Sequence, residues 1–153
     1  MRAVIQRVRH ACVRVDGQVT GQIGTGLFVL LGVEQADTLK DAQALATKTA
    51  GLRIFSDESG KMCLGASDVG GGFLVVSNFT LYGDCRKGRR PDFTRAAGAA
   101  QAQALYRAFV QALCEACAPA GLPVETGLFG ADMRIEMDGD GPVTLVLDTA
   151  EWR

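Results

Sequence analysis

The sequence predicts an α+β fold with mostly antiparallel strands and two main helices. Three observations support this fold class. Short apolar stretches, alternating or continuous, recur along the chain; Gly- and Asp-rich turns separate them; and two stretches place apolar residues at helical spacing. With 153 residues, of which 48% are hydrophobic and 22% charged, the chain is long enough for a real core. We therefore expect residues 1–153 to form a single domain.

The first part of the chain is expected to be rich in strands. Residues 2–9 and 11–15 alternate between two faces, and Asp16-Gly17 is a strong two-residue hairpin signal that returns the chain through residues 18–23. Residues 27–33 are apolar on both faces, which predicts a central strand covered on both sides.

Two helices are predicted from apolar residues at helical spacing. The first is capped by Asp37 or Thr38 and ends at Gly51. Its predicted inner face consists of Leu39, Ala42, Leu45, Ala46 and Thr49. The second helix ends at Pro119 and Gly121, and its stripe is typical of core packing rather than cofactor binding. That stripe consists of Ala102, Leu105, Tyr106, Phe109, Leu113 and Cys117.

Further strands are expected between and after the helices. Residues 52–55 and 62–64 flank a turn, residues 73–77 are apolar enough for a buried strand, and residues 124–126 follow the second helix. Residues 78–94 are polar and irregular.

The C-terminal region predicts a final hairpin. Met133, Ile135 and Met137 alternate with polar residues before a Gly/Asp cluster, and Val143, Leu145 and Leu147 alternate after it. Pro142 stands at the start of the second strand, where its missing N–H does least harm. Residue chemistry allows two interpretations of this cluster: an ordinary turn, or a Gly-Pro corner that directs backbone carbonyls at a ligand.

Composition narrows the function. The formal net charge is −1, so any RNA contact must be local. Arginines interrupt the N-terminal apolar residues, which argues against a signal peptide, and the longest apolar run, residues 27–33, is too short to cross a membrane.

Five unevenly spaced cysteines argue against a disulfide framework and favour a cytoplasmic location. Cys114 and Cys117 lack a second pair, which favours packed thiols over a zinc site.

No standard catalytic set is present. His10 is the only histidine, so a two-histidine metal site is excluded and a Ser-His-Asp triad could be built only on this residue. The chain has neither of the two glycine-rich nucleotide-binding motifs. We therefore predict no metal and no cofactor.

Two stretches remain as candidates for chemistry. Ser77-Asn78-Phe79-Thr80-Leu81 follows a buried strand and either presents hydroxyls and backbone N–H groups to an ester oxyanion, or is simply a polar strand end. Arg86, Lys87, Arg89 and Arg90 crowd the next loop. They form either a solvated face or a phosphate-binding patch that contacts RNA.

The Ser77–Leu81 stretch and Gly141-Pro142-Val143-Thr144 together resemble the two signature motifs of the D-aminoacyl-tRNA deacylases. The resemblance extends nearly from end to end and includes Ile5-Gln6-Arg7-Val8, residues 26–33, Arg53–Asp57, Gly60–Met62, Arg90–Phe93, Ala104–Tyr106, Gly127, Phe129, Ala131 and Met133. It implies a homodimer with a β/β/α arrangement, two active sites at the interface, and hydrolysis of the ester of D-aminoacyl-tRNA and of mischarged glycyl-tRNA.

The resemblance also implies a role for each site residue. The Gly141–Pro142 bond would be cis, held in place by Arg7, with two carbonyls that exclude the Cβ of an L-amino acid but cannot reject glycine. Backbone amides of Phe79 and Thr80 would stabilise the oxyanion, assisted by the 2′-hydroxyl of the RNA. The side chains of Ser77 and Thr80 would shape the pocket, and Phe129 and Met133 would border the terminal adenosine.

The chain departs from the family pattern at two positions. Asn78 replaces the usual Gln and is one methylene shorter, and Gly139 replaces the usual Asn and loosens the backbone. Two other functions stay open: a conventional esterase with Thr80 or Ser77 as nucleophile, and a non-catalytic tRNA-binding module.

Overall fold

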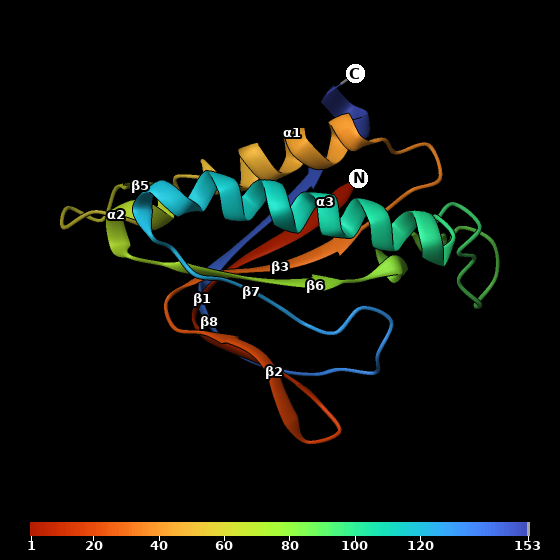
Figure 1. Cartoon of the computed structure of the whole chain (residues 1–153), viewed down its shortest axis with the longest axis horizontal. Helices are drawn as coiled ribbons and strands as arrows, with labels where there is room; N and C mark the ends of the chain where they lie inside the picture. The colour runs from red at the N-terminus through yellow and green to blue at the C-terminus, as the bar shows by residue number, and fades with distance from the viewer. Residues whose placement is uncertain (153) are drawn as a thin grey trace.

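The structure is a computed structural model that describes residues 1–152 (Figure 1). These residues form a six-stranded sheet in the order β2-β1-β3-β6-β7, with β8 paired to β1, and a separate two-stranded sheet, β4-β5. The strands are β1 Arg2–Val15, β2 Gln18–Ile23, β3 Gly26–Gly32, β4 Phe55–Ser56, β5 Met62–Leu64, β6 Gly72–Ser77, β7 Val124–Thr126 and β8 Arg134–Asp148. The helices are α1 Leu39–Ala50, α2 Ala66–Val69 and α3 Ala99–Cys117, with 3₁₀ turns η1 Phe79–Tyr82, η2 Ala118–Ala120 and η3 Thr149–Trp152.

The α+β class is confirmed, and the sheet is mixed. The β1–β2, β1–β3 and β1–β8 pairs are antiparallel, whereas β3–β6 and β6–β7 are parallel. The predicted hairpin at Asp16-Gly17 is present, and both residues have the positive φ that such a tight turn requires. The sequence pattern did not reveal the parallel pairs or the short helix α2.

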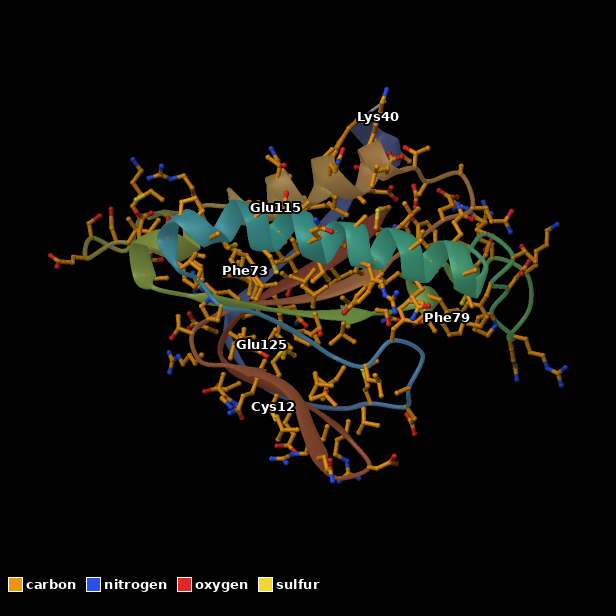
Figure 2. The ribbon with its side chains drawn as sticks, viewed as in Figure 1. Cys12, Lys40, Phe73, Phe79, Glu115 and Glu125 are labelled. Carbon is orange, nitrogen blue, oxygen red and sulfur yellow. The ribbon has the colours of Figure 1, made fainter. Side chains whose placement is uncertain are left out.

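Two clusters of buried apolar residues within residues 1–152 define a layered arrangement. The first lies between the sheet and helices α1 and α3, which cover one face side by side in Figure 1. It includes Phe73, which Figure 2 labels between α3 and the sheet. The second cluster, which includes Val13, Phe28 and Leu74, lies on the opposite face of the same sheet, where its β1–β2 end curls away from the helices in Figure 1. The sheet is therefore covered on both faces, as the apolar character of β3 predicted.

The predicted inner face of the first helix is right except at its start. Ala42, Leu45, Ala46 and Thr49 are buried, but Leu39 is 54% exposed. Asp41 is buried instead because its carboxylate accepts hydrogen bonds from the backbone N–H and hydroxyl of Thr38, forming a capping box. In the first turn, the hydrogen bonds of the helix cap therefore determine which residue is buried, and the apolar pattern does not.

The predicted C-terminal hairpin is wrong. Residues 134–148 form one long strand, and both of its halves run antiparallel to β1. The pairing passes from Gln6–Thr144 to Val8–Gly139, so residues 140–143 bulge out opposite Arg7. The Gly/Asp/Pro cluster marks a break in the ladder, but the chain does not reverse direction there.

Within residues 1–152, no helix is both long enough and apolar enough to cross a lipid bilayer.

Candidate active site

The Ser77–Leu81 loop leaves the carboxyl end of buried strand β6 and is anchored to its neighbour. The Asn78 N–H donates to the Leu31 carbonyl at 2.8 Å, which continues the β3–β6 pairing by one step. The chain then turns into η1, with Asn78 as N-cap in an extended conformation. The central strands thus fix where this loop begins.

The Asn78 side chain caps η1. Its Oδ1 accepts the Thr80 N–H at 3.1 Å and the Thr80 hydroxyl at 2.5 Å. Asn is among the strongest N-cap residues because its short side chain reaches the first free N–H groups of a helix. Phe79 N–H, in contrast, has no protein acceptor among residues 1–152. Of the two backbone amides expected to stabilise an oxyanion, the Thr80 N–H already donates to Asn78, whereas the Phe79 N–H remains available to a ligand.

A pocket of about 540 Å³ opens beside this loop. Its lining includes Ser77, Asn78, Phe79, Thr80, Tyr106, Phe129 and Met133, together with small residues at the start of α3. In Figure 2, Phe79 lies close to that end of α3. The structure therefore brings five predicted site residues, Ser77, Phe79, Thr80, Phe129 and Met133, to one pocket.

Phe129 and Met133 reach the pocket from the loop between β7 and β8. The Phe129 ring packs on Tyr106 with the ring centroids 5.6 Å apart. Met133 fits because Gly127 lacks a side chain: a Cβ at Gly127 would lie 2.6 Å from the Met133 sulfur. These contacts fix an apolar wall in the same pocket that Ser77, Asn78 and Thr80 line with polar groups.

Tyr106 is a pocket residue that its helical stripe identified only as core. Its hydroxyl donates to the Val75 carbonyl at 2.9 Å, which holds α3 against β6. Burial raises the pKa of Tyr106 to about 12, so the phenol stays neutral near pH 7 and cannot serve as a base. His10 is exposed in β1 and does not line the pocket. The lining thus lacks an imidazole to activate a nucleophile.

The Gly-Pro corner is the bulge in β8. The Gly141–Pro142 peptide bond is cis, as the family resemblance implied, and Gly141 has φ +128°. A Cβ at Gly141 would lie 2.6 Å from the backbone nitrogen of Val143. This backbone conformation therefore requires glycine.

Arg7 holds the bulge from the opposite strand. Its Nε lies 2.9 Å from Asp140 Oδ2, as an ion pair without an aligned hydrogen bond, and its Nη1 donates to the Ile54 carbonyl at 2.7 Å. The Arg7 side chain is 11% exposed, so this ion pair is shielded more than a surface pair would be. Arg7 therefore joins the bulge in β8 to the segment that precedes β4.

The corner and the pocket are separate features within one chain. Arg7, Gly141 and Pro142 do not line the pocket formed by the Ser77–Leu81 loop.

The basic loop, residues 86–90, comes shortly after the pocket-lining residues 77–80 in the sequence. Arg86 pairs with Asp84, and this contact lowers the pKa of the Asp84 carboxyl to about 2. Within residues 1–152, Lys87, Arg89 and Arg90 are exposed and form no ion pair. The Phe93 ring packs edge-on against the Phe79 ring with the ring centroids 5.1 Å apart, and this contact connects the loop to the pocket rim.

Gly139, unlike Gly141, has room for a side chain. A Cβ at Gly139 would meet no atom within 4 Å, and its φ lies outside the left-handed region. We expect Gly139→Asn to change the free energy of unfolding by no more than about 0.5 kcal/mol, as for other open surface positions. Urea unfolding measures this change. A loss of several kcal/mol would show that the bulge depends on glycine at position 139 as well.

The chain is similar to a known protein family and to curated relatives over nearly its whole length. The family model described as D-Tyr-tRNA(Tyr) deacylase matches residues 4–148. A D-aminoacyl-tRNA deacylase of Chloroflexus aurantiacus is 57% identical over 153 residues, which cover 100% of this chain and 93% of the relative. One of Anaeromyxobacter dehalogenans is 56% identical over 97% of each chain.

Solved structures share the fold. A c-Myc DNA unwinding element binding protein superposes with a TM-score of 0.89 at 40% identity, covering 97% of this chain and 98% of the other. A probable eukaryotic D-amino acid tRNA deacylase, 18% identical with a TM-score of 0.78 over 95% of this chain and 97% of its own, shows the same fold. From the family match, the close relatives and the shared architecture, we conclude that this chain belongs to the D-Tyr-tRNA(Tyr) deacylase family.

Proposed function

We propose that this protein hydrolyses the ester bond of D-aminoacyl-tRNA and releases the D-amino acid and free tRNA in the cytoplasm. The observation that carries the proposal is the pocket, which combines Ser77, Phe79 and Thr80 with an apolar wall of Phe129 and Met133. Relatives that are 50–57% identical over nearly the whole chain are named D-aminoacyl-tRNA deacylases. The aminoacylated end of tRNA offers an ester for the polar loop and a planar base for the apolar wall.

The protein contributes oxyanion stabilisation to this reaction. Water attacks the ester carbonyl, the carbonyl oxygen gains negative charge, the bond to the ribose oxygen breaks, and a proton lost by the attacking water passes to that ribose oxygen. The free Phe79 N–H is the donor available to that oxygen, and one such donor is worth about 100-fold or more in rate. The neighbouring 2′-hydroxyl of the ribose assists, so no protein base is required.

A second copy of the chain selects the chirality of the esterified amino acid. The Gly141-Pro142 corner of one subunit faces the pocket of the other, and its carbonyls leave no space for the Cβ of an L-amino acid. A D-amino acid directs its side chain elsewhere, and glycine has none. The same site therefore accepts glycyl-tRNA.

The surface of β8 supports such a homodimer. This strand pairs with β1 alone among the strands of residues 1–152, so its other edge is unpaired. Ile135, Met137 and Val146 are 39%, 40% and 63% exposed along it. Exposed apolar residues on an open strand edge favour association with another chain. Because β8 also carries the corner, a dimer formed through it brings the corner to the interface.

The RNA backbone is held by the basic loop. Arg86, Lys87, Arg89 and Arg90 lie in the loop between η1 and Phe93, whose ring contacts Phe79 of the pocket lining. Phosphates near the 3′ end of tRNA reach these side chains while the terminal adenosine contacts Phe129 and Met133. This local patch accounts for RNA binding by a chain whose net charge is −1.

The decisive experiment compares D-tyrosyl-tRNA, L-tyrosyl-tRNA and glycyl-tRNA as substrates of the purified protein. We expect cleavage of the D-tyrosyl and glycyl esters and at least about 100-fold slower cleavage of the L-tyrosyl ester, the size of effect expected from a steric misfit at a reacting centre. Equal cleavage of the D- and L-esters would refute the chiral filter. Salt-sensitive tRNA binding without turnover would identify a binding module instead.

The same structure argues against Thr80 as a covalent nucleophile. Its hydroxyl proton is donated to an amide oxygen, which is not a base and cannot take up the proton during attack. Acid quenching during turnover should therefore trap no acyl-enzyme at Thr80 or Ser77. A trapped ester would support the conventional esterase.

A further inference from the structure

The hydrogen bonds of Asn78 fix the polarity of the Thr80 hydroxyl. The Thr80 backbone N–H can only donate, so the Asn78 atom 3.1 Å away must be the carboxamide oxygen. That oxygen can only accept, so the Thr80 hydroxyl 2.5 Å from it must donate its hydrogen. The hydrogen is thus committed to Asn78, and only lone pairs of Thr80 Oγ remain to face the pocket.

The loop therefore presents two different groups to a ligand. Phe79 offers an N–H donor without an acceptor among residues 1–152, and Thr80, which also lines the pocket, offers an acceptor. Without Asn78, the Thr80 hydroxyl could rotate and act as donor or acceptor in turn. Asn78 removes that freedom before any substrate arrives.

We propose that Asn78 is a positioning residue that fixes Thr80 Oγ as a hydrogen-bond acceptor for the aminoacylated ribose. This inference rests on the proposed function, because the ligand it requires is the aminoacyl end of tRNA. That end carries two donors close to the ester: the 2′-hydroxyl of the ribose and the α-ammonium of the amino acid. Both present the same chemistry to Thr80 Oγ, and the experiment separates them.

The length of the Asn78 side chain is essential to this role. An Asn at the N-cap reaches the amide two residues later, which is the geometry observed with Thr80. A Gln side chain at position 78 would be one methylene longer, so its amide would not reach the same two donors in the same conformation. The role is therefore specific to chains with Asn at this position.

The test measures binding of a non-hydrolysable D-tyrosyl-adenosine, in which an amide replaces the ester, by calorimetry. Two matched analogues each lack one donor: one has a 2′-deoxyribose, and in the other a hydrogen replaces the α-amino group. The wild-type protein should lose affinity about 10-fold for one of the two, as expected when a single hydrogen bond is removed. The analogue that loses affinity identifies the donor.

Variants show whether Asn78 and Thr80 make this bond. In Thr80→Val, which keeps the shape but lacks the hydroxyl, removing the same donor should cost less than about 2-fold, because the bond is already absent. In Asn78→Ala the hydroxyl can rotate and is no longer held as an acceptor, so the loss of affinity should be smaller than in the wild type. Thr80→Ser retains the hydroxyl and should restore the wild-type response. A purely structural role of either residue would lower affinity for all analogues equally.

Three results would overturn the inference: neither analogue weakens wild-type binding, Asn78→Ala keeps the full response, or Thr80→Ser fails to restore it. Deacylation of D-tyrosyl-tRNA by the wild-type protein is measured in parallel. If the wild type neither binds the parent analogue nor cleaves this substrate, the proposed function fails as well. That result differs from the one in which an active enzyme binds all three analogues with the same affinity, which overturns only the role of Asn78.

Discussion

Gly141→Ala is expected to lower D-aminoacyl-tRNA cleavage by about 100-fold or more, a typical cost of moving a binding wall by an ångström. The reason is steric and local. Gly141 has φ +128°, and an added Cβ would lie 2.6 Å from the Val143 nitrogen and 2.9 Å from its Cγ2 atom. The backbone of residues 140–143 must shift to relieve these contacts, so the carbonyls of the corner leave the position that the filter requires.

Gly139→Ala is the matched control for this prediction. It lies two residues away in the same strand and receives the same methyl group, but that methyl meets no atom within 4 Å. Steady-state cleavage of D- and L-tyrosyl-tRNA by both variants, with thermal unfolding to confirm folding, measures the difference. If Gly141→Ala cleaves the D-ester at the wild-type rate and still rejects the L-ester, the corner is not part of the filter.

The pocket shows which kinds of site residue the sequence could predict. Ser77 and Thr80 were predicted because a hydroxyl-rich segment follows a buried strand, and β6 indeed ends in this segment. The capping role of Asn78 was not predicted, because the sequence shows the residue type but not whether the side chain turns back to its own backbone. Tyr106 was assigned to the core alone, and its place in the helical stripe could not show that the same ring also borders a cavity.

The C-terminal strand shows the limit of pattern analysis most clearly. Alternation before and after the Gly/Asp/Pro cluster fits a hairpin and a bulged strand equally well, because both interrupt the ladder with the same residue types. The choice depends on β1, whose 14 residues are long enough to pair with both halves of β8. That pairing joins residues far apart in the sequence, so the residues on either side of the Gly/Asp/Pro cluster do not reveal it. It also places residues 140–143 opposite Arg7, which explains why the arginine contacts them.

Phe79→Pro is the sharpest test of the oxyanion role. Proline removes the backbone N–H, and the loop can accept it: Phe79 is the first residue of η1, its N–H has no protein acceptor among residues 1–152, and Asn78 already has the extended conformation that precedes proline. We expect cleavage of D-tyrosyl-tRNA to fall about 100- to 1,000-fold, as for loss of one oxyanion donor. Phe79→Ala, which loses only the ring and its contact with Phe93, is the control and should lose far less.

The two variants together test whether each site is shared between subunits. In a two-fold symmetric dimer of one Phe79→Pro and one Gly141→Ala chain, one site combines both defects and the other combines an intact loop with an intact corner. Unfolding and refolding the inactive variants together should thus restore roughly a quarter of the wild-type activity, because half of the dimers are mixed and each has one intact site. If loop and corner acted within one chain, every site would retain a defect and the mixture would stay inactive. Recovery of activity would therefore show that the corner of one chain completes the pocket of the other.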